Sequence, residues 1–325
     1  MTKPRDPGTR SAEADLSKVR TIPIRTRANK VDSSLLATPP AADRAFDAFL
    51  RSLPDVLAAR DLRAVIGAVA AAAGHRGVIV MIGGHVIKTG LGPLLVHLMR
   101  RGVLTHVAMN SAASIHDFEL CAYGGTSEDV AAGLADGTFG MAAETGRDMN
   151  AAINSGAANG WGMGEALGRG LAAMQAAPGR EQSVLLAAHE LGLPVTVHAA
   201  IGTDITHQHP DADGAAIGAT SFTDFKRLAG SVPALHDGGV VLNFGSAVIM
   251  PEVFLKALTV ARNLGEGRPT GFTAADFDMI RHYRPRMNVV DRPVRAGGTG
   301  YSITGHHELL VPLLVWGVDA ALGPR

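Results

Sequence analysis

Short apolar runs separated by amphipathic stretches dominate the chain from residue 77 onward. Four runs are continuous, rich in β-branched residues and short enough to be buried strands: 77–82, 105–109, 195–201 and 239–244. Two further short strands are expected at 271–279 and 287–290. The intervening stretches predict helices at 91–101, 183–191, 224–235, 251–264 and 308–322. This alternation predicts an α/β fold: a doubly wound, mostly parallel Rossmann-like sheet with helices on both faces.

Three other segments differ from this pattern. Residues 1–38 are interpreted as an N-terminal tail or arm, because they begin with a polar stretch rich in Pro and Gly. Residues 39–325 then form a single domain, which opens with two Ala- and Leu-rich helices over 41–73, separated by Pro54. Residues 124–162 are rich in Gly and Ala and have few large apolar side chains, so they are interpreted as a mobile insertion or lid.

The composition narrows the classes of partner. Thirty basic residues balance thirty acidic ones and aromatic residues make up 5% of the chain, so neither nucleic acid nor a membrane is expected as a partner. No apolar run reaches the roughly 18 residues of a membrane span, and no secretory signal is expected. The single cysteine, Cys121, fits a reducing cytoplasm, and a buried helix position is expected for it rather than a nucleophilic role.

Polar clusters follow two of the predicted strands and precede the last predicted helix. They occupy residues 114–119, 202–210 and 305–308. Open parallel sheets bind ligands outside the carboxyl ends of their strands, so these clusters predict an active site. Their side chains suited to acid–base work are the candidate catalytic residues: His116, Asp117, His209, His307 and Glu308.

Several of these candidates have a structural alternative. Asp117 stands near the predicted start of a helix, where its charge suits a cap, so capping competes with catalysis. His116 and Glu119 are three residues apart and could share a helix face. The His-x-His at 207–209 could hold a metal together with the histidines at 306–307, or these rings could bond to backbone carbonyls. The chain lacks a diagnostic zinc spacing, and no metal is predicted.

Three glycine-containing turns could bring backbone N–H groups close to a phosphate. Residues 83–90 join the first strand to its helix without matching G-x-G-x-x-G or the Walker pattern, and an ordinary tight turn is an equal alternative. Lys88 in this turn could pair with a phosphate, act as a base or be solvated. Residues 245–247 and 297–300 are further possible phosphate cradles, although the latter could equally be a flexible loop. The basic run 281–286 could meet an anionic substrate or form a solvated turn.

Taken in order, these blocks resemble deoxyhypusine synthase and its relatives. Residues 78–98 are similar to the family's strand, Ser/Thr-containing turn and amphipathic helix. Residues 110–117 stand where the family has T-A-G-G-x-E-E-D, and residues 203–204 are similar to its T-D pair. Residues 239–247 resemble its G-G-G strand and turn, and residues 312–315 match P-L-L-V in its last helix.

The resemblance implies a bound NAD, and a tetramer built from dimers with active sites at a subunit interface. The residues that it implies for binding the cofactor are Thr89, Gly90, Asn110, Ala112, Asp204, Gly245, Ser246 and His306. Three departures stand out. Past Lys256 the chain has no lysine, so the lysine that takes up the aminobutyl group in deoxyhypusine synthase is missing. His116-Asp117 replaces the family's acidic pair, and His306 replaces its final Asp.

These observations together predict an NAD-dependent enzyme. Its expected substrate is a small amine or amino acid, oxidised to an imine that then undergoes transfer, deamination or cyclisation. One alternative is a metal-dependent hydrolase or lyase that uses the histidine cluster. The other is a nucleotide-binding relative without catalytic activity.

Overall fold

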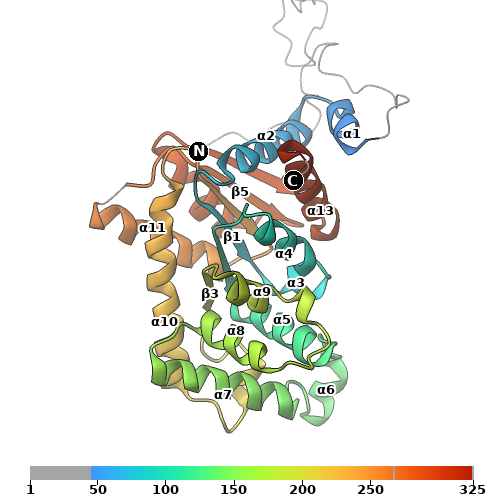
Figure 1. The fold of residues 1–325 in the computed structure, drawn as a ribbon, viewed down its shortest axis with the longest axis vertical. Coiled ribbons are helices and arrows are strands. Elements are labelled where there is room, and N and C mark those ends of the chain that lie inside the picture. The colour runs from blue at the N-terminus through green and yellow to red at the C-terminus, as the bar shows by residue number, and fades with distance from the viewer. Residues whose placement is uncertain (1–44, 266–267, 324–325) are drawn as a thin grey trace, which may run out of the picture. The chain divides into compact units, whose positions relative to one another are not determined.

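One parallel six-stranded sheet organises the protein in the computed structural model, which describes residues 45–265 and 268–323 (Figure 1). Its strands lie in the order β3-β2-β1-β4-β5-β6, and every neighbouring pair is parallel. They are β1 (Val78–Ile82), β2 (His106–Asn110), β3 (Val195–His198), β4 (Val240–Phe244), β5 (Thr273–Asp278) and β6 (Thr299–Thr304). The predicted tail, residues 1–38, lies outside the described residues.

Helices cover both faces of the sheet, which confirms the predicted doubly wound α/β fold. The side chains of Val78, Val80 and Ile82 join one apolar cluster, whereas those of Ile79 and Met81 join another, because successive strand residues point to opposite faces. The first cluster is completed chiefly by α2 (Leu57–Ala72), α4 (Gly92–Arg100), α9 (Val184–Leu191) and α13 (His307–Leu322). The second is completed by α10 (Gly214–Ser231) and α11 (Ile249–Leu264). The inner strands β1 and β4 are buried at every position and almost entirely apolar, so their runs were visible in the sequence.

The order of the strands reverses between β1 and β4, and the chain backbones approach closely there. Gly83, directly after β1, donates its N–H to the carbonyl of Phe244 at 2.9 Å. A Cβ on Gly83 would lie only 2.2 Å from the carbonyl oxygen of Gly245. Gly245 itself has φ +63°, a conformation that favours glycine. In sheets of this order, ligands bind in the crevice at the point of reversal.

A long helical segment connects β2 to β3. It contains α5 (Ser111–Tyr123), α6 (Val130–Asp136), α7 (Ala143–Asn159), α8 (Met163–Ala173), the short helix η4 (Arg180–Gln182) and α9. Most of the predicted mobile insertion, 124–162, is therefore helical. Its α7 packs against α8 and α10 and buries Met149 and Ile153 in the main core. Glycine and alanine here allow close helix packing, as at Gly156, where a Cβ would meet Ala166 at 2.6 Å.

Two expectations near the C-terminus are wrong. Residues 287–290, predicted as a strand, lie in the helical turn η7 (Arg286–Asp291), which follows α12 (Tyr283–Pro285) and precedes η8 (Pro293–Arg295). The sixth strand is instead β6, which includes part of the glycine run interpreted as a loop or phosphate cradle. Gly300 fits there because a Cβ would lie 2.0 Å from the carbonyl oxygen of Val290. A short apolar run cannot by itself distinguish a strand from a buried helical turn, and Val289 is such a buried residue.

The remaining helices agree with the sequence pattern, apart from where α10 begins. Residues 41–73 were expected to form two helices, and α1 (Phe46–Ser52) and α2 lie on either side of Pro54. Helix α10 begins ten residues earlier than predicted, because Asp213 caps it by accepting from the N–H groups of Ala215 and Ala216. Short helices α3 (Gly84–Lys88), η5 (Ile205–Gln208) and η6 (Val232–Leu235) lie in the connections. None of the helices in the described part of the chain has the length and apolar character needed to cross a bilayer.

A buried carboxylate, that of Asp224 in α10, joins α8 to β3. Its Oδ2 accepts hydrogen bonds of 2.8 Å from the backbone N–H groups of Gly164 and Val197. Burial raises the pKa of the Asp224 carboxyl to about 7, although these two donors and the nearby Arg227 act in the opposite direction. The folded protein therefore holds a proton on Asp224 at a pH where the unfolded chain has lost it.

The contact at the reversal point predicts opposite effects for two glycine substitutions. Gly83→Ala is expected to lower the free energy of unfolding by about 1–3 kcal/mol, because the neighbouring backbone would have to move. Gly218→Ala, in the middle of α10 with open space around the new Cβ, is the matched control and is expected to raise it by up to about 1 kcal/mol. Urea unfolding of both variants measures the difference. Equal midpoints would contradict the close approach at Gly83.

The raised pKa of Asp224 predicts a defined pH dependence. Since its folded-state pKa of about 7 exceeds the usual value of 3.8, the folded state binds the proton more tightly, and its contribution to stability is lost as pH rises from about 4 to about 7. Asp224→Asn is expected to abolish this part of the pH dependence. The measurement is the free energy of unfolding of both proteins across this range. A constant difference between the two curves would show that Asp224 does not titrate there.

Candidate active site

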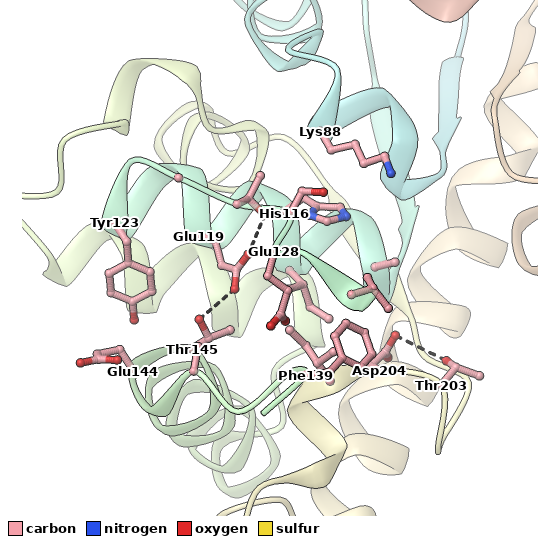
Figure 2. A pocket seen from close by; sticks show the side chains of 18 residues that line it. Lys88, His116, Glu119, Tyr123, Glu128, Phe139, Glu144, Thr145, Thr203 and Asp204 are labelled. Atoms are coloured by element: carbon pink, nitrogen blue, oxygen red, sulfur yellow. Dashed lines mark hydrogen bonds between the residues drawn. The ribbon is translucent and has the colours of Figure 1, made fainter. Parts of the chain in front are cut away.

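A cavity of about 770 Å³ opens where the chain leaves β2 and β3 (Figure 2). This volume is in the range of small-molecule binding sites. The residues that line it come from α3, α5, α6, α7, η5 and the loops after α5, α6 and β3: Lys88, Ala112, Ile115, His116, Glu119, Tyr123, Gly125, Thr126, Ser127, Glu128, Val130, Phe139, Ala142, Glu144, Thr145, Thr203, Asp204 and Ile205. We call this cavity the β2–β3 pocket.

Helix α5 directs His116 and Glu119 into the β2–β3 pocket. It begins directly after β2, where the side chain of Asn110 caps it by accepting from the N–H of Ala113 at 3.0 Å. Residues three and four positions apart share a helix face, so Ala112, His116 and Glu119 all line the cavity. The expected shared face of His116 and Glu119 is thereby confirmed.

A chain of hydrogen bonds joins these two side chains through the loop that follows α5. His116 Nδ1 lies 2.7 Å from the hydroxyl of Thr126, which in turn donates to Glu119 Oε2 at 2.6 Å. The hydroxyl of Thr145, from α7, donates to the other carboxylate oxygen of Glu119 at 2.9 Å. Glu119 thus holds both the loop and α7 against α5 (Figure 2).

The environment of His116 favours a neutral ring. Burial lowers the pKa of its imidazole, and the positive charge of Lys88 lowers it further. Figure 2 shows the ring beneath the Lys88 side chain, which reaches toward it from α3. At neutral pH His116 is therefore a proton acceptor rather than a cation.

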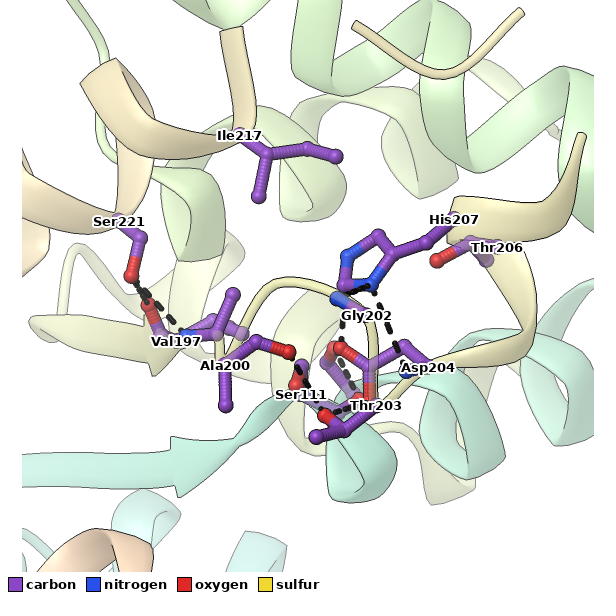
Figure 3. A network of polar contacts seen from close by, with 12 residues as sticks. Ser111, Val197, Ala200, Gly202, Thr203, Asp204, Thr206, His207, Ile217 and Ser221 are labelled. Atoms are coloured by element: carbon purple, nitrogen blue, oxygen red, sulfur yellow. Dashed lines mark hydrogen bonds and ion pairs between the residues drawn. The ribbon is translucent and has the colours of Figure 1, made fainter. Parts of the chain in front are cut away.

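Asp204 forms a second polar centre of the same pocket (Figure 3). Its side chain is 6% exposed, and its pKa is raised by burial, against the hydrogen bond from Ser111 and the charge of His207. His207 Nε2 lies 3.6 Å from Asp204 Oδ2, and the Thr203 hydroxyl lies 3.4 Å from Oδ1. Among the described residues, Oδ2 has no hydrogen-bond partner. A buried acceptor beside a cavity whose nearest donor, His207 Nε2, is too distant for a hydrogen bond is suited to a hydroxyl or ammonium group of a ligand.

Carboxylates outnumber cations around the cavity. Glu119, Glu128, Glu144 and Asp204 line it, whereas Lys88 is the one lysine or arginine among the described lining residues. Glu128 is fixed in place because its Oε1 accepts the N–H of Gly140 at 2.9 Å. Such a cavity attracts small cations by its charge.

Asp117 lies next to His116 in sequence but points away from the pocket. Its carboxylate is 2% exposed and accepts three hydrogen bonds at the start of α9, from the hydroxyl of Ser183 and the N–H groups of Val184 and Leu185. Neighbouring residues of a helix face different directions, which separates the two roles. The capping alternative therefore describes Asp117, although the helix that it caps is α9 rather than its own.

A second group of predicted residues gathers at the reversal point of the sheet. His307, fully buried at the start of α13, donates from Nε2 to the carbonyl of Phe277 at 3.0 Å. A Cβ on Gly245 would lie 2.9 Å from its ring. Ser246 Oγ accepts from the N–H of Met250 at 3.1 Å, in the first turn of α11. The neighbouring His306 and Glu308 are exposed, with His306 Nδ1 3.7 Å from Glu308 Oε1.

The start of α3 connects this second group to the β2–β3 pocket. A Cβ on Gly84 would lie 3.2 Å from Ala112 and from the ring of His116. The next residue, His85, packs its ring against that of His307, with centroids 5.5 Å apart. The pocket and the reversal point therefore lie on either side of one short helix.

The other predicted site residues have local contacts. The hydroxyl of Thr89 donates to the carbonyl of His85 one turn earlier, and Gly90 adopts φ +84° where α3 ends. His209 bonds through Nε2 to the carbonyl of Gly140 at 2.8 Å, against α7, and does not line the pocket. Cys121 is buried in α5, as expected, and burial raises the pKa of its thiol to about 11.

The described residues bring no three histidine, cysteine or acidic side chains together in a way that could hold a metal ion. His207 and His209 lie beside α7 and the β2–β3 pocket, whereas His306 and His307 lie at the reversal point beyond α3. The histidine clusters that suggested a metal site in the sequence are therefore separate in space.

Comparison with known proteins identifies the fold. No protein-family model and no curated protein matches the sequence. Among solved structures, a candidate deoxyhypusine synthase from Entamoeba histolytica is 10% identical, with a TM-score of 0.52 over 85% of this chain and 93% of its own. A conserved candidate LOR/SDH protein from Methanococcus maripaludis S2 is 15% identical, with a TM-score of 0.50 over 81% of this chain and 68% of its own. This chain has a deoxyhypusine synthase-like fold.

At these identities the likeness extends to the fold alone. A further match, ArgZ, an arginine dihydrolase from the ornithine-ammonia cycle in cyanobacteria, is 16% identical with a TM-score of 0.49. This chain covers only 32% of the length of that protein. These likenesses therefore do not determine the chemistry of the site, which depends on the residues of this chain.

Several pocket residues of this chain were not predicted from the sequence. Thr126, Glu128, Phe139 and Thr145 all belong to the segment interpreted as a mobile insertion. For Lys88, the sequence favoured solvation over pairing with a phosphate or acting as a base. The composition of 124–162 suggested a cover over the site, yet no spacing indicated which of its side chains would meet α5.

The divergent directions of His116 and Asp117 predict different effects on stability. Asp117→Ala is expected to lower the free energy of unfolding by about 1–3 kcal/mol, because buried donors at the start of α9 lose their acceptor. His116→Ala, one residue earlier and at the pocket, is expected to cause a smaller loss. Chemical unfolding of the two variants gives both values. A smaller loss for Asp117→Ala than for His116→Ala would contradict the structural role of Asp117.

Proposed function

We propose that this protein is an NAD-dependent enzyme that oxidises a small amine or amino acid to an imine, which then undergoes transfer, deamination or cyclisation. The observation that carries the proposal is the β2–β3 pocket. It is lined by carboxylates, contains a neutral imidazole, and opens at the carboxyl edge of a sheet whose strand order is typical of dinucleotide-binding folds.

The residues at this edge fit a dinucleotide. Asp204 Oδ2 is a buried acceptor that makes no hydrogen bond within the described residues, which suits a ribose hydroxyl. The backbone after β4, at Gly245 and Ser246, and the turn at Thr89 and Gly90 would hold the phosphates, together with Asn110, Ala112 and His306 at the ends of β2 and β6. NAD, when bound, supplies the acceptor for the hydride of the substrate.

The charge of the pocket supports an amine as the substrate. Glu119 and Glu128 would bind the substrate ammonium and hold it in place. His116 Nε2 would then accept a proton from the substrate nitrogen, which an amine must lose to become an imine. Lys88 would pair with the carboxylate of an amino acid, or remain solvated if the substrate is a simple diamine.

Deoxyhypusine synthesis through a covalent lysine imine is not part of the proposal, because the chain has no lysine past Lys256. We retain the tetramer and the cytoplasmic location expected from the sequence as proposals. His307 and Glu308 are proposed to support the cofactor side of the crevice. His209 is proposed to position the segment around Gly140 rather than to act on the substrate, because its Nε2 is bonded to that carbonyl.

The test combines cofactor binding with turnover. Calorimetric titration with NAD is expected to show saturable binding, and NADH is expected to form with one or more small diamines or basic amino acids. His116→Ala is expected to lower kcat by about 10²- to 10⁴-fold with little change in NAD affinity. The matched control is His97→Ala, an exposed histidine of α4 paired with Asp319, which is expected to retain full activity.

Three outcomes would overturn this proposal. Protein that binds no NAD in calorimetry, and from which denaturation releases none, is not an NAD-dependent enzyme. Stoichiometric zinc, iron or manganese in NAD-free protein would instead favour the metal-dependent hydrolase or lyase. NAD binding without turnover of any amine would leave a nucleotide-binding protein without catalytic activity.

A further inference from the structure

Thr126 stands between His116 and Glu119 and contacts both. Its hydroxyl has a single hydrogen, which it donates to Glu119 Oε2 at 2.6 Å. Toward His116 Nδ1, 2.7 Å away, the same oxygen can only accept. The hydrogen in that contact must therefore be on Nδ1 of the imidazole.

A neutral imidazole carries one hydrogen, so placing it on Nδ1 leaves a lone pair on Nε2. We propose that Thr126 is a positioning residue that holds neutral His116 in the Nδ1–H form and so keeps Nε2 free to accept a proton from the substrate. The role of Nε2 in turnover rests on the proposed function, whereas the assignment of the hydrogen rests on the two hydrogen bonds alone.

Glu119 keeps the Thr126 hydroxyl oriented. A carboxylate only accepts, so both oxygens of Glu119 draw hydroxyl hydrogens toward themselves. Thr145 occupies Oε1 at 2.9 Å and leaves Oε2 to Thr126. Without a carboxylate at this position, the Thr126 hydroxyl could rotate and donate to Nδ1 instead, which would favour the opposite form of the ring.

The backbone brings Thr126 back to its own helix. Gly124 ends α5 with φ +79°, so the chain reverses there and the loop returns along the pocket side. Thr126 can therefore meet residues seven and ten positions earlier in the sequence. The segment that follows, ending in α7, supplies Thr145 to the same carboxylate.

The charges around His116 are consistent with this arrangement. Lys88 of α3 faces the ring and, together with burial, lowers its pKa. Glu119 of α5 acts on it through Thr126, and Gly84 and Ala112, which lie beside the ring, carry no charge. A ring that stays neutral needs a defined position for its one hydrogen, and the Thr126 hydroxyl is the group that determines it.

The experiment is ¹⁵N solid-state NMR of histidine-labelled protein at a pH above 8, where the ring is neutral. A His116→Gln sample identifies the His116 signals among the 13 histidines. The wild type is expected to show a protonated Nδ1 and an unprotonated Nε2. Thr126→Val, which keeps the shape but removes the hydroxyl, is expected to shift His116 toward the Nε2–H form, whereas Thr126→Ser is expected to restore the Nδ1–H form.

Thr145→Val is the matched control, since it removes the other hydroxyl from Glu119 and leaves Thr126 in place. It is expected to keep the Nδ1–H form. A wild-type His116 with its hydrogen on Nε2 would overturn the inference. So would a Thr126→Val protein whose His116 signals equal those of the wild type.

Kinetics separate this inference from the proposed function. Where amine oxidation is measured, Thr126→Val is expected to lower kcat by about 10- to 100-fold, less than loss of the base itself, with KM little changed. A change of KM alone would overturn the role of Thr126 in proton transfer. If the Nδ1–H form is found in a protein that oxidises no amine, the proposed function fails while the assignment of the hydrogen stands.

Discussion

The parallel direction of all six strands is the constraint on which the rest of the molecule depends. Because every strand runs the same way, the loops after β1, β2, β3 and β4 emerge at one edge of the sheet. The reversal of strand order between β1 and β4 then opens a crevice at this edge, and glycine at positions 83 and 245 allows the two loops to approach. The β2–β3 pocket and the histidines at the start of α13 both derive their position from this arrangement.

Helix α5 serves the core and the pocket at once. One side carries Asp117, whose buried carboxylate caps α9, and the other carries His116 and Glu119. The pocket side chains are thereby mounted on a helix that is tied to its neighbours by buried hydrogen bonds. A helix held in this way limits the motion of His116 and Glu119, and positioning a substrate requires side chains of limited motion.

In the connection between β2 and β3, composition determines how closely the helices pack, whereas the path of the chain determines which side chains reach the pocket. Its glycines and alanines permit close packing of α7 on α8 and α10, and several of its polar side chains line the pocket. Thr126 and Thr145 meet Glu119 only because Gly124 turns the chain back and α7 lies across α5. Thr126 lies beyond the end of α5 and Thr145 lies on another helix, so the periodicity of α5 relates neither of them to Glu119.

The sequence by itself determined the alternating α/β order, five of the six strand positions and the edge at which polar residues gather, because burial on both faces makes most positions of a parallel strand apolar. It also indicated His116 and Asp204 as candidate site residues. Only the tertiary structure decided that Asp117 turns inward while His116 faces the pocket, that the histidines at 207–209 and 306–307 stay apart, and that residues 299–304 rather than 287–290 form the last strand. The physical reason is that these outcomes depend on which distant segments pack together, whereas periodicity reports only the burial of neighbouring positions.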